Sequence, residues 1–420
     1  MNELARRIQR TYLTLVLGNT LAASFIWGIN TLFLLDAGLS NFEAFAANAF
    51  FTAGMVIFEV PTGVVADTWG RRASYLLGTI TLAATTLAYY LMWQLEAAFW
   101  AWAIVSVLLG LGFTFFSGAV EAWLVDALHF AEYAGTLETV LGRGQMVGGA
   151  AMLGGSVLGG VVAQATDLGV PFLLRVAVLA AMFVVAFRLM QDWGFEHKRV
   201  THPVRAMRGV LDASLEHGLR NRPVRFVMLA APFTSGVGIY TFYALQPFLL
   251  ELYGDPQAYS IAGLAAAIIA SAQIAGGLAA PWIRRLFARR TSALIVATAS
   301  SAVLLVLLGL IGSFWAALAL LVVWSGVAAA SMPIRQAYLN DMIPSPQRAT
   351  VLSFDSLMGS SGGVVIQPVL GRAADVFSYS TSFVIGGVIQ LAALPFLAGS
   401  RRQRHPADTA TTAPSTPTAS

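Results

Sequence analysis

Long apolar runs are the feature that most constrains how this chain folds. They recur along nearly all of its 420 residues, separated by short polar breaks, and each is about as long as the ~20 residues that one bilayer crossing needs. We therefore predict an all-α membrane protein with twelve transmembrane helices. The predicted helices are residues 11–36, 43–67, 73–94, 97–127, 140–166, 171–191, 224–253, 258–284, 291–312, 314–341, 350–376 and 379–400.

The composition agrees with a bilayer as the main solvent. Hydrophobic residues make up 57% of the chain and charged residues 11%, against roughly 25% charged in an ordinary soluble domain. The absence of cysteine excludes a disulfide framework and a thiol nucleophile. The histidines lack metal-binding spacing, and no Walker loop is present. We expect no cofactor, no metal, no nucleic-acid partner and no enzymatic activity.

The positions of the basic residues predict the orientation. With the N-terminus in the cytoplasm, all but two of the 25 Lys and Arg residues fall in or beside cytoplasmic segments. The two exceptions are Arg175 and Arg372. The positive-inside rule therefore predicts a multi-pass protein of the cell inner (cytoplasmic) membrane, with both termini cytoplasmic.

The predicted helices divide into two bundles joined by a linker. Pro203 to Leu219 of the linker can form an amphipathic helix lying on the inner leaflet. The last residues are rich in Thr, Ala, Pro and Ser, which is typical of a disordered cytoplasmic tail. The predicted boundaries are 1–191 for the N-terminal bundle, 192–223 for the linker, 224–400 for the C-terminal bundle and 401–420 for the tail.

The two halves repeat weakly. Asp126 ends the fourth predicted helix and Asp341 ends the tenth. The basic turn at Arg71 corresponds, at about the same offset, to one at Arg284 and Arg285. Parallel six-helix repeats of this kind are typical of two-bundle transporters.

The loop after the second helix, with the sequence PTGVVADTWGRR, carries the most informative motif. Glycine allows a close approach and a tight turn there, and arginines anchor the loop at the cytoplasmic interface. The motif resembles the signature of the major facilitator superfamily, and its place after the second of twelve helices also matches. The resemblance implies two six-helix bundles related by pseudo-two-fold symmetry. It also implies a gate that locks the bundles together when the cytoplasmic side is closed. The gate residues are Gly63, Asp67, Gly70, Arg71, Arg72 and, by location, Asp126.

Two partners for this gate can be predicted. Ser345 and Pro346 open the eleventh helix, so its positive dipole end could receive Asp67. Asp126 could pair with Arg71. The alternative is that these residues are only interface charges that hold the topology. In the C-terminal half the motif has decayed, with Pro281 in the place of Asp67.

The fifth helix resembles, in part, the glycine-rich antiporter motif of drug exporters, although it lacks that motif's Gly at 151 and Pro at 156. Small residues at this spacing can equally serve close helix packing. The Arg-containing motif that many proton-driven exporters carry on the fourth helix is absent. The residues concerned are Gly142, Ala151, Gly155, Ser156, Gly159 and Gly160.

Ionisable residues inside a membrane are costly and need a partner or a purpose. Glu59 lies near mid-depth on the second helix without an evident basic partner, which makes it a proton-site candidate. Glu121 lies at the right depth to meet Arg143, and the pair forms either a coupling site or a static bridge. Asp355 is another acid, for which we expect solvation near the cytoplasmic end.

The predicted cavity lining is mostly aromatic with a few amides, which suits a small amphipathic organic solute. We predict a secondary active transporter, monomeric, that exports such a compound in exchange for protons by alternating access. The alternative is a uniporter or an importer of a small nutrient with the same fold. The substrate-contact candidates are Asn19, Phe25, Trp27, Phe113, Phe116, Tyr240, Tyr243, Gln246 and Trp324.

Overall fold

The computed structural model describes residues 3–116, 118–195, 220–343 and 348–409. Helices account for almost all of these residues. The N-terminal half contains α1 (Glu3–Trp27), α2 (Asn30–Asp36), α3 (Asn41–Trp69), α4 (Arg71–Gln94), α5 (Phe99–Thr114), α6 (Ala119–Phe130), α7 (Leu137–Ala165) and α8 (Val170–Leu189). The C-terminal half contains α10 (Arg222–Tyr253), α11 (Tyr259–Arg285), α12 (Arg290–Leu310), α13 (Phe314–Met342), α14 (Arg348–Val376), α15 (Tyr379–Leu391), α16 (Ala393–Arg402) and the 3-10 helix η3 (Pro406–Asp408).

These helices make a multi-pass membrane protein. Within the described ranges, ten continuous or broken helices are long and apolar enough to cross a bilayer, and the bent α1–α2 pair makes an eleventh. The twelfth long element is α14, whose hydropathy is lowered by four charged residues. These are Arg348, Asp355, Arg372 and Asp375. The prediction of twelve transmembrane helices in an all-α fold is therefore confirmed.

Three of the predicted helices are broken, and the twelfth is divided at Ala392 into α15 and α16. The first bends by 47° between α1 and α2, where Gly28 lies against Gly263 of α11 so closely that a Cβ would be 3.0 Å from the Gly263 Cα. The fourth is interrupted between α5 and α6, where Gly118 has a φ of +70°. Glycine adopts this left-handed conformation at little cost.

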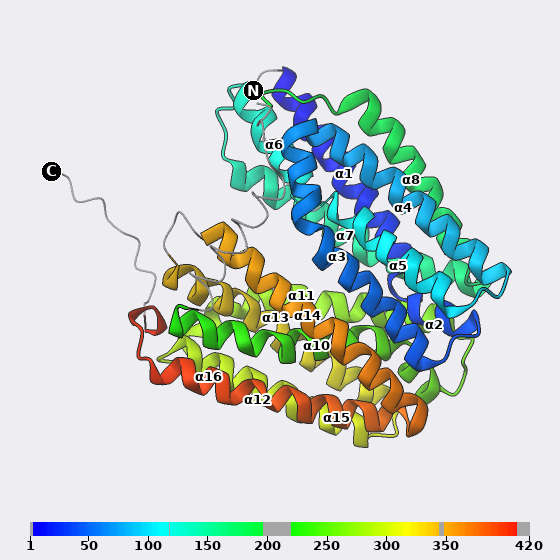
Figure 1. The fold of residues 1–420 in the computed structure, drawn as a ribbon, viewed down its shortest axis with the longest axis vertical. Helices are drawn as coiled ribbons and strands as arrows, with labels where there is room; N and C mark the ends of the chain where they lie inside the picture. The colour runs from blue at the N-terminus through cyan, green and yellow to red at the C-terminus, as the bar shows by residue number, and fades with distance from the viewer. Residues whose placement is uncertain (1–2, 117, 196–219, 344–347, 410–420) are drawn as a thin grey trace.

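The two halves form two bundles with the same internal pairing. In the N-terminal bundle α1 packs on α7, α3 on α5, and α4 on α8. In the C-terminal bundle α10 packs on α14, α11 on α13, and α12 on α15. Each bundle is thus built in the same way from its six membrane-spanning segments (Figure 1).

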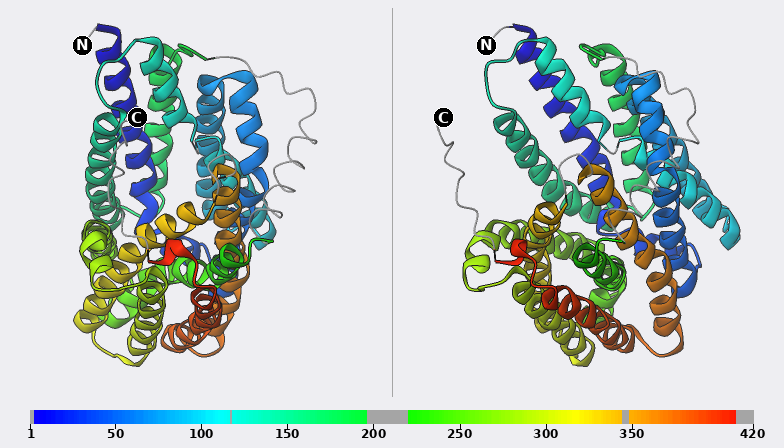
Figure 2. Two further views of the ribbon diagram at one scale, coloured as in Figure 1. Left: turned by 90° about the vertical axis from the view of Figure 1, so that its left-hand side faces the viewer. Right: turned by 60° about the vertical axis from the view of Figure 1, so that its left-hand side comes forward.

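The bundles touch at one end and are splayed apart at the other (Figure 2). We call the side where α1 begins and α16 ends the terminal side, and the opposite side the far side. Contacts between bundles join the first half of α3 to the second half of α14, and the second half of α7 to the first half of α11. Examples are Gly371 against Phe45 and Gly160 against Gly263. The structure is therefore closed on the far side and open on the terminal side.

Two predicted segments need comment. Residues 401–409 were predicted to belong to the disordered tail, but α16 continues to Arg402 and η3 packs against α13. The prediction was wrong for these residues, because composition does not reveal that Asp408 finds a buried partner; it is 1% exposed. The predicted linker helix, Pro203 to Leu219, lies outside the described residues.

Candidate functional site

A cavity of about 480 Å³ is lined almost wholly by the N-terminal bundle. Its walls come from α1, α2, α3, α4, α5, α7 and α8 of the N-terminal bundle, and Tyr243 of α10 is the contribution of the C-terminal bundle. Most of the lining is apolar, including Met55, Leu82 and Leu179. Ligand cavities in proteins are typically apolar with a few placed polar groups, so this cavity is the candidate substrate site. A hollow of about 660 Å³ around Arg6, Arg7 and Leu189 lies at the start of α1, away from the bundle interface.

The polar groups of the cavity are few. Asn30 donates to Asn48 (Nδ2–Oδ1 3.0 Å), and Tyr75 donates from behind the wall to Asn19 (OH–Oδ1 2.7 Å). Arg175 of α8 is the one charged residue among the lining residues, all of which are described. In the sequence, Arg175 stood out only as one of the two basic residues that do not lie in or beside a predicted cytoplasmic segment. That exception was the signal in the sequence, since a basic residue far from the predicted cytoplasmic side needs another explanation.

Five of the nine predicted substrate contacts line the cavity and four do not. Those that line it are Asn19, Trp27, Phe113, Phe116 and Tyr243. Those that do not are Phe25, Tyr240, Gln246 and Trp324.

The four residues outside the cavity have packing or clamping roles. Phe25 and Trp324 lie in hydrophobic cores, and the Tyr240 hydroxyl bonds to Ser382 (2.6 Å) inside the C-terminal bundle. Gln246 joins the two bundles, because its amide donates to the Trp27 carbonyl (2.8 Å) and accepts from the Thr31 N–H (2.8 Å). Gln246 therefore belongs to the set of contacts that closes the far side between the bundles, which we call the far-side seal.

The far-side seal has a second clamp. Asp375, at the end of α14, accepts hydrogen bonds from the backbone N–H groups of Asn41 (2.9 Å) and Phe42 (2.8 Å) in the first turn of α3. The Tyr379 hydroxyl donates to the Asn41 side chain. A carboxylate at a helix N-terminus is favoured both by these hydrogen bonds and by the helix dipole. Asp375 thus fastens one bundle to the other.

The loop motif lies at the open, terminal side. Arg71 contacts Asp67 (2.8 Å) and Asp126 of α6 (3.8 Å). Asp67 is about one-third exposed, and all three residues belong to one bundle. A Cβ at Gly63 would meet no atom within 4 Å, so the expected close approach is absent in this conformation. Ser345 and Pro346 lie outside the described residues.

Gly70 and Arg72 of the motif meet an aspartate that the sequence analysis did not use. Gly70 has a φ of +102°, and a Cβ on it would collide with the Asp192 carboxylate. Asp192 accepts from the Arg72 N–H (2.9 Å) and so caps the start of α4. The Arg72 side chain donates to the Phe187 carbonyl (2.5 Å). The motif therefore ties the start of α4 to the chain after α8.

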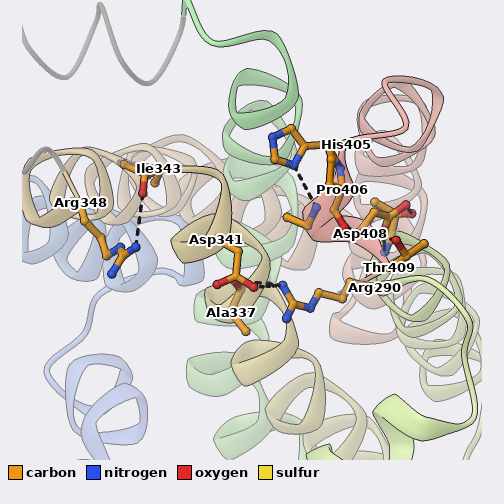
Figure 3. Close-up of polar contacts among 11 residues, drawn as sticks. Arg290, Ala337, Asp341, Ile343, Arg348, His405, Pro406, Asp408 and Thr409 are labelled. Carbon is orange, nitrogen blue, oxygen red and sulfur yellow. Dashed lines mark hydrogen bonds and ion pairs between the residues drawn. The ribbon is translucent and has the colours of Figure 1, made fainter. Parts of the chain in front are cut away.

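The C-terminal bundle repeats this arrangement with other residues (Figure 3). Arg290, in the first turn of α12, pairs with Asp341 (2.6 Å), as Arg71 does with Asp126. Asp408 accepts from the N–H (2.8 Å) and the hydroxyl (2.8 Å) of Thr291, as Asp192 does at α4. The counterpart of Arg71 is thus Arg290 and not Arg284, because α12 begins later than a constant offset implied.

The predicted acidic sites differ from the expectation. Glu121 and Arg143 are both exposed and form no ion pair with each other in the described residues. Glu59 is half-buried and interacts with another group of the protein. Asp355 is not solvated as expected: it is 7% exposed and bound by both terminal nitrogens of Arg335 (2.6 and 2.7 Å).

Glycines of α7 are used for packing. Gly155 lies against Ser24, and Gly159 against the Phe25 carbonyl, so that α1 approaches α7 at backbone distance. Ser24 donates across this contact to the Ala151 carbonyl (3.1 Å). Gly160 meets α11 of the other bundle. At Gly142, in contrast, an added Cβ would meet no atom within 4 Å, so this glycine is not required for packing in this conformation.

Comparisons with known proteins agree with this architecture. A curated relative, an uncharacterized MFS-type transporter of Methanocaldococcus jannaschii, is 21% identical over 230 residues, which is 54% of this chain and 56% of the relative. The chain thus spans little more than half of that relative.

Solved structures show the same fold. A variant of the nucleoside transporter NupG superposes with a TM-score of 0.80 at 12% identity, covering 93% of this chain and 99% of that one. A D-xylose–proton symporter gives 0.63 at 17% identity, covering 94% and 98%. A bacterial homologue of the human lysosomal transporter Spinster, inward-facing and unoccupied, gives 0.71 at 14% identity, covering 96% and 98%. The family model of the major facilitator superfamily matches residues 12–288 and 259–419, so the chain belongs to that superfamily.

Proposed function

We propose that this protein is a secondary active transporter that exports a small amphipathic organic compound in exchange for protons, by alternating access. The observation that carries the proposal is the cavity of the N-terminal bundle, to which the C-terminal bundle adds Tyr243. It is apolar apart from a few polar groups, and it lies in a structure whose bundles are joined on the far side. A molecule of several hundred cubic ångströms can be bound there and released when the bundles rock. The protein then lies in the cell inner membrane with the terminal side cytoplasmic and acts as a monomer.

The polar contacts on the far side differ from those on the terminal side, which supports two alternating states. On the far side Asp375 and Gln246 join the bundles in this conformation. On the terminal side Asp67 and Arg71 interact within one bundle and are available for the other. The gate proposed for Asp67, Arg71 and Asp126 is therefore unlocked in this inward-open state.

Protons are the proposed driving ion. A potential of 100 mV supplies about 2.3 kcal/mol per charge and one pH unit about 1.4 kcal/mol. One proton can then sustain a substrate gradient of about several hundredfold. Glu59 is the preferred carrier, because it is a half-buried acid one turn from the cavity wall.

The test is transport in proteoliposomes that contain the purified protein and carry an imposed pH gradient. Uphill movement of an amphipathic compound that collapses with a protonophore is expected. Equilibration without accumulation would replace the proposal with the uniporter alternative. Uphill movement with the protons, in the same direction, would replace it with proton-coupled import.

A further inference from the structure

Arg175 is a buried cation without an anionic partner. It is 8% exposed, its Nε is buried without a hydrogen-bond partner, and no carboxylate of the described residues lies within 4.0 Å of it. Arg290 gives the contrast inside the same molecule, since it is 4% exposed and pairs with Asp341 at 2.6 Å. An ionisable residue held unpaired inside a membrane protein is costly and indicates a function.

A second donor in the same cavity is also unused. Asn48 is 4% exposed and its Nδ2 has no hydrogen-bond partner, although its Oδ1 accepts from Asn30. Arg175 and Asn48 both line the cavity. Buried donors need an acceptor, and the lining contains no Asp or Glu to provide one.

The rest of the lining defines the body of the ligand. Phe113, Phe116 and Leu179 present rings and aliphatic groups, and Tyr89 and Tyr243 add two further rings to the lining. A single cation balances a single negative charge. A ligand with several charges would bring anions that this lining cannot pair.

We infer that the cavity binds a monovalent organic anion, a carboxylate carried on an aromatic or aliphatic body. The carboxylate accepts from Arg175, whose planar fork suits two oxygens, and from Asn48, while the body packs on the aromatic walls. This inference rests on the proposed transport function and narrows its substrate class.

The binding test uses the full-length protein in nanodiscs with 2-naphthoate and its neutral analogue 2-naphthamide as probes. Sulfate replaces chloride in the buffer, so that a small halide does not occupy the site. We expect calorimetry to give at least about tenfold tighter binding of the acid, because a charge-assisted hydrogen bond is roughly twice as strong as a neutral one. Equal affinities, or binding of neither probe, overturn the inference.

Arg175→Gln is expected to weaken the binding of naphthoate by about thirtyfold or more and that of naphthamide by much less, so that the preference for the acid is lost. Arg188→Gln is the matched control, since Arg188 lies on the same helix but is exposed. It should change neither affinity. An acid preference that survives Arg175→Gln contradicts the anion site.

The stability of the unliganded protein gives a readout that does not depend on a ligand. Arg175→Met should raise the apparent Tm, because it removes an unpaired buried charge, whereas a structural role for Arg175 predicts a lower Tm. Arg188→Met should leave the Tm unchanged. A lower Tm for Arg175→Met alone overturns the inference.

Flux measurements separate this inference from the function on which it rests. Transport of naphthamide that is unaffected by Arg175→Gln, without transport of naphthoate, overturns the anion site and leaves the transporter standing. Arg175-dependent binding of naphthoate without carrier-mediated flux of any compound overturns the transporter and leaves the anion site standing.

Discussion

Glu59 is placed where a proton carrier would connect the cavity with the open cleft. Asn48 and Met55 line the cavity from α3, and Glu59 follows Met55 by one helical turn on the same face, toward the terminal side. It is half-buried and engaged with another group of the protein. Protonation there would be felt by the cavity and by α3 together.

We therefore expect Glu59→Gln, which mimics the protonated acid, to abolish pH-driven accumulation and to preserve substrate counterflow. The mutant still binds and exchanges substrate because the cavity lining is intact. Both assays are run on the same proteoliposomes. Full pH-driven accumulation by the mutant would place the proton site elsewhere.

Glu121→Gln is the control for this prediction. The sequence analysis predicted that Glu121 pairs with Arg143, but the two side chains are exposed and do not form a pair among the described contacts. Glu121→Gln should therefore give a normal folded yield.

Phe113 and Phe25 allow the contribution of an aromatic ring to substrate binding to be compared with its contribution to packing. Phe113 lines the cavity and is 40% exposed, whereas Phe25 is 9% exposed in a hydrophobic core. Phe113→Ala should weaken substrate binding and change the apparent Tm little. Phe25→Ala should cost about 3–5 kcal/mol of stability. Binding and thermal unfolding of both variants check this, and an unchanged substrate affinity in Phe113→Ala removes it from the site.

Sequence reasoning found the depth of candidate residues but not the face of the helix on which they lie. Tyr240 and Tyr243 are one turn apart on α10, yet only Tyr243 reaches the cavity. Helices in a membrane protein are apolar on several faces, so hydropathy does not reveal their rotation. The rotation is set by packing between distant segments, as when Gln246 reaches the Trp27 carbonyl.

At the scale of elements, α3 and α14 pack against each other across the bundle interface, and each has an aspartate near its end. Asp375 of α14 caps the start of α3 on the far side, and this contact is made here. Asp67 of α3 was predicted to meet the start of α14 on the other side. Each carboxylate would then stabilise one of the two states, by contacts that exist in that state alone.

Asp375→Asn is accordingly expected to shift the population toward closure of the terminal side, and Asp67→Asn toward its opening. Spin labels at the exposed positions Trp69 and Ser353, across the terminal side, measure the distance distribution. The shorter distance should gain population in Asp375→Asn and lose it in Asp67→Asn.

Asp167→Asn is the matched control, because Asp167 caps the start of α8 within a single bundle (2.8 Å to the Gly169 nitrogen). It should not move the distribution. If Asp375→Asn behaves like this control, the far-side clamp does not set the equilibrium.

Element positions were largely predictable because the apolar runs match the bilayer thickness. The positions of the breaks were not predictable. Gly28, at the bend, lies against Gly263 of the other bundle, and no local pattern reveals such a contact. The pairing of Arg71 with Asp126 could be anticipated through the family resemblance. The equivalent pair in the C-terminal bundle, Arg290 with Asp341, could not be predicted, because the sequence does not show at which residue α12 begins.

For the whole molecule, the orientation in the membrane is the prediction to be checked. The native chain has no cysteine, so single cysteines can be placed cleanly. Thr409→Cys, after α16, should react with an impermeant reagent only after lysis, and Gln257→Cys, in the α10–α11 loop, should react in intact cells. The reverse pattern would invert the proposed topology.

The two aspartate caps also have a consequence for the order in which the bundles mature during synthesis. Asp192 reaches back 120 residues to the start of α4, and Asp408 reaches back 117 residues to the start of α12. Asp192 is synthesised before the C-terminal bundle, so the N-terminal bundle can fold completely before the second bundle is made. The second cap emerges only after the last membrane helix. Until then the first turn of α12 lacks this cap, so the C-terminal bundle is completed only by the residues that follow α16.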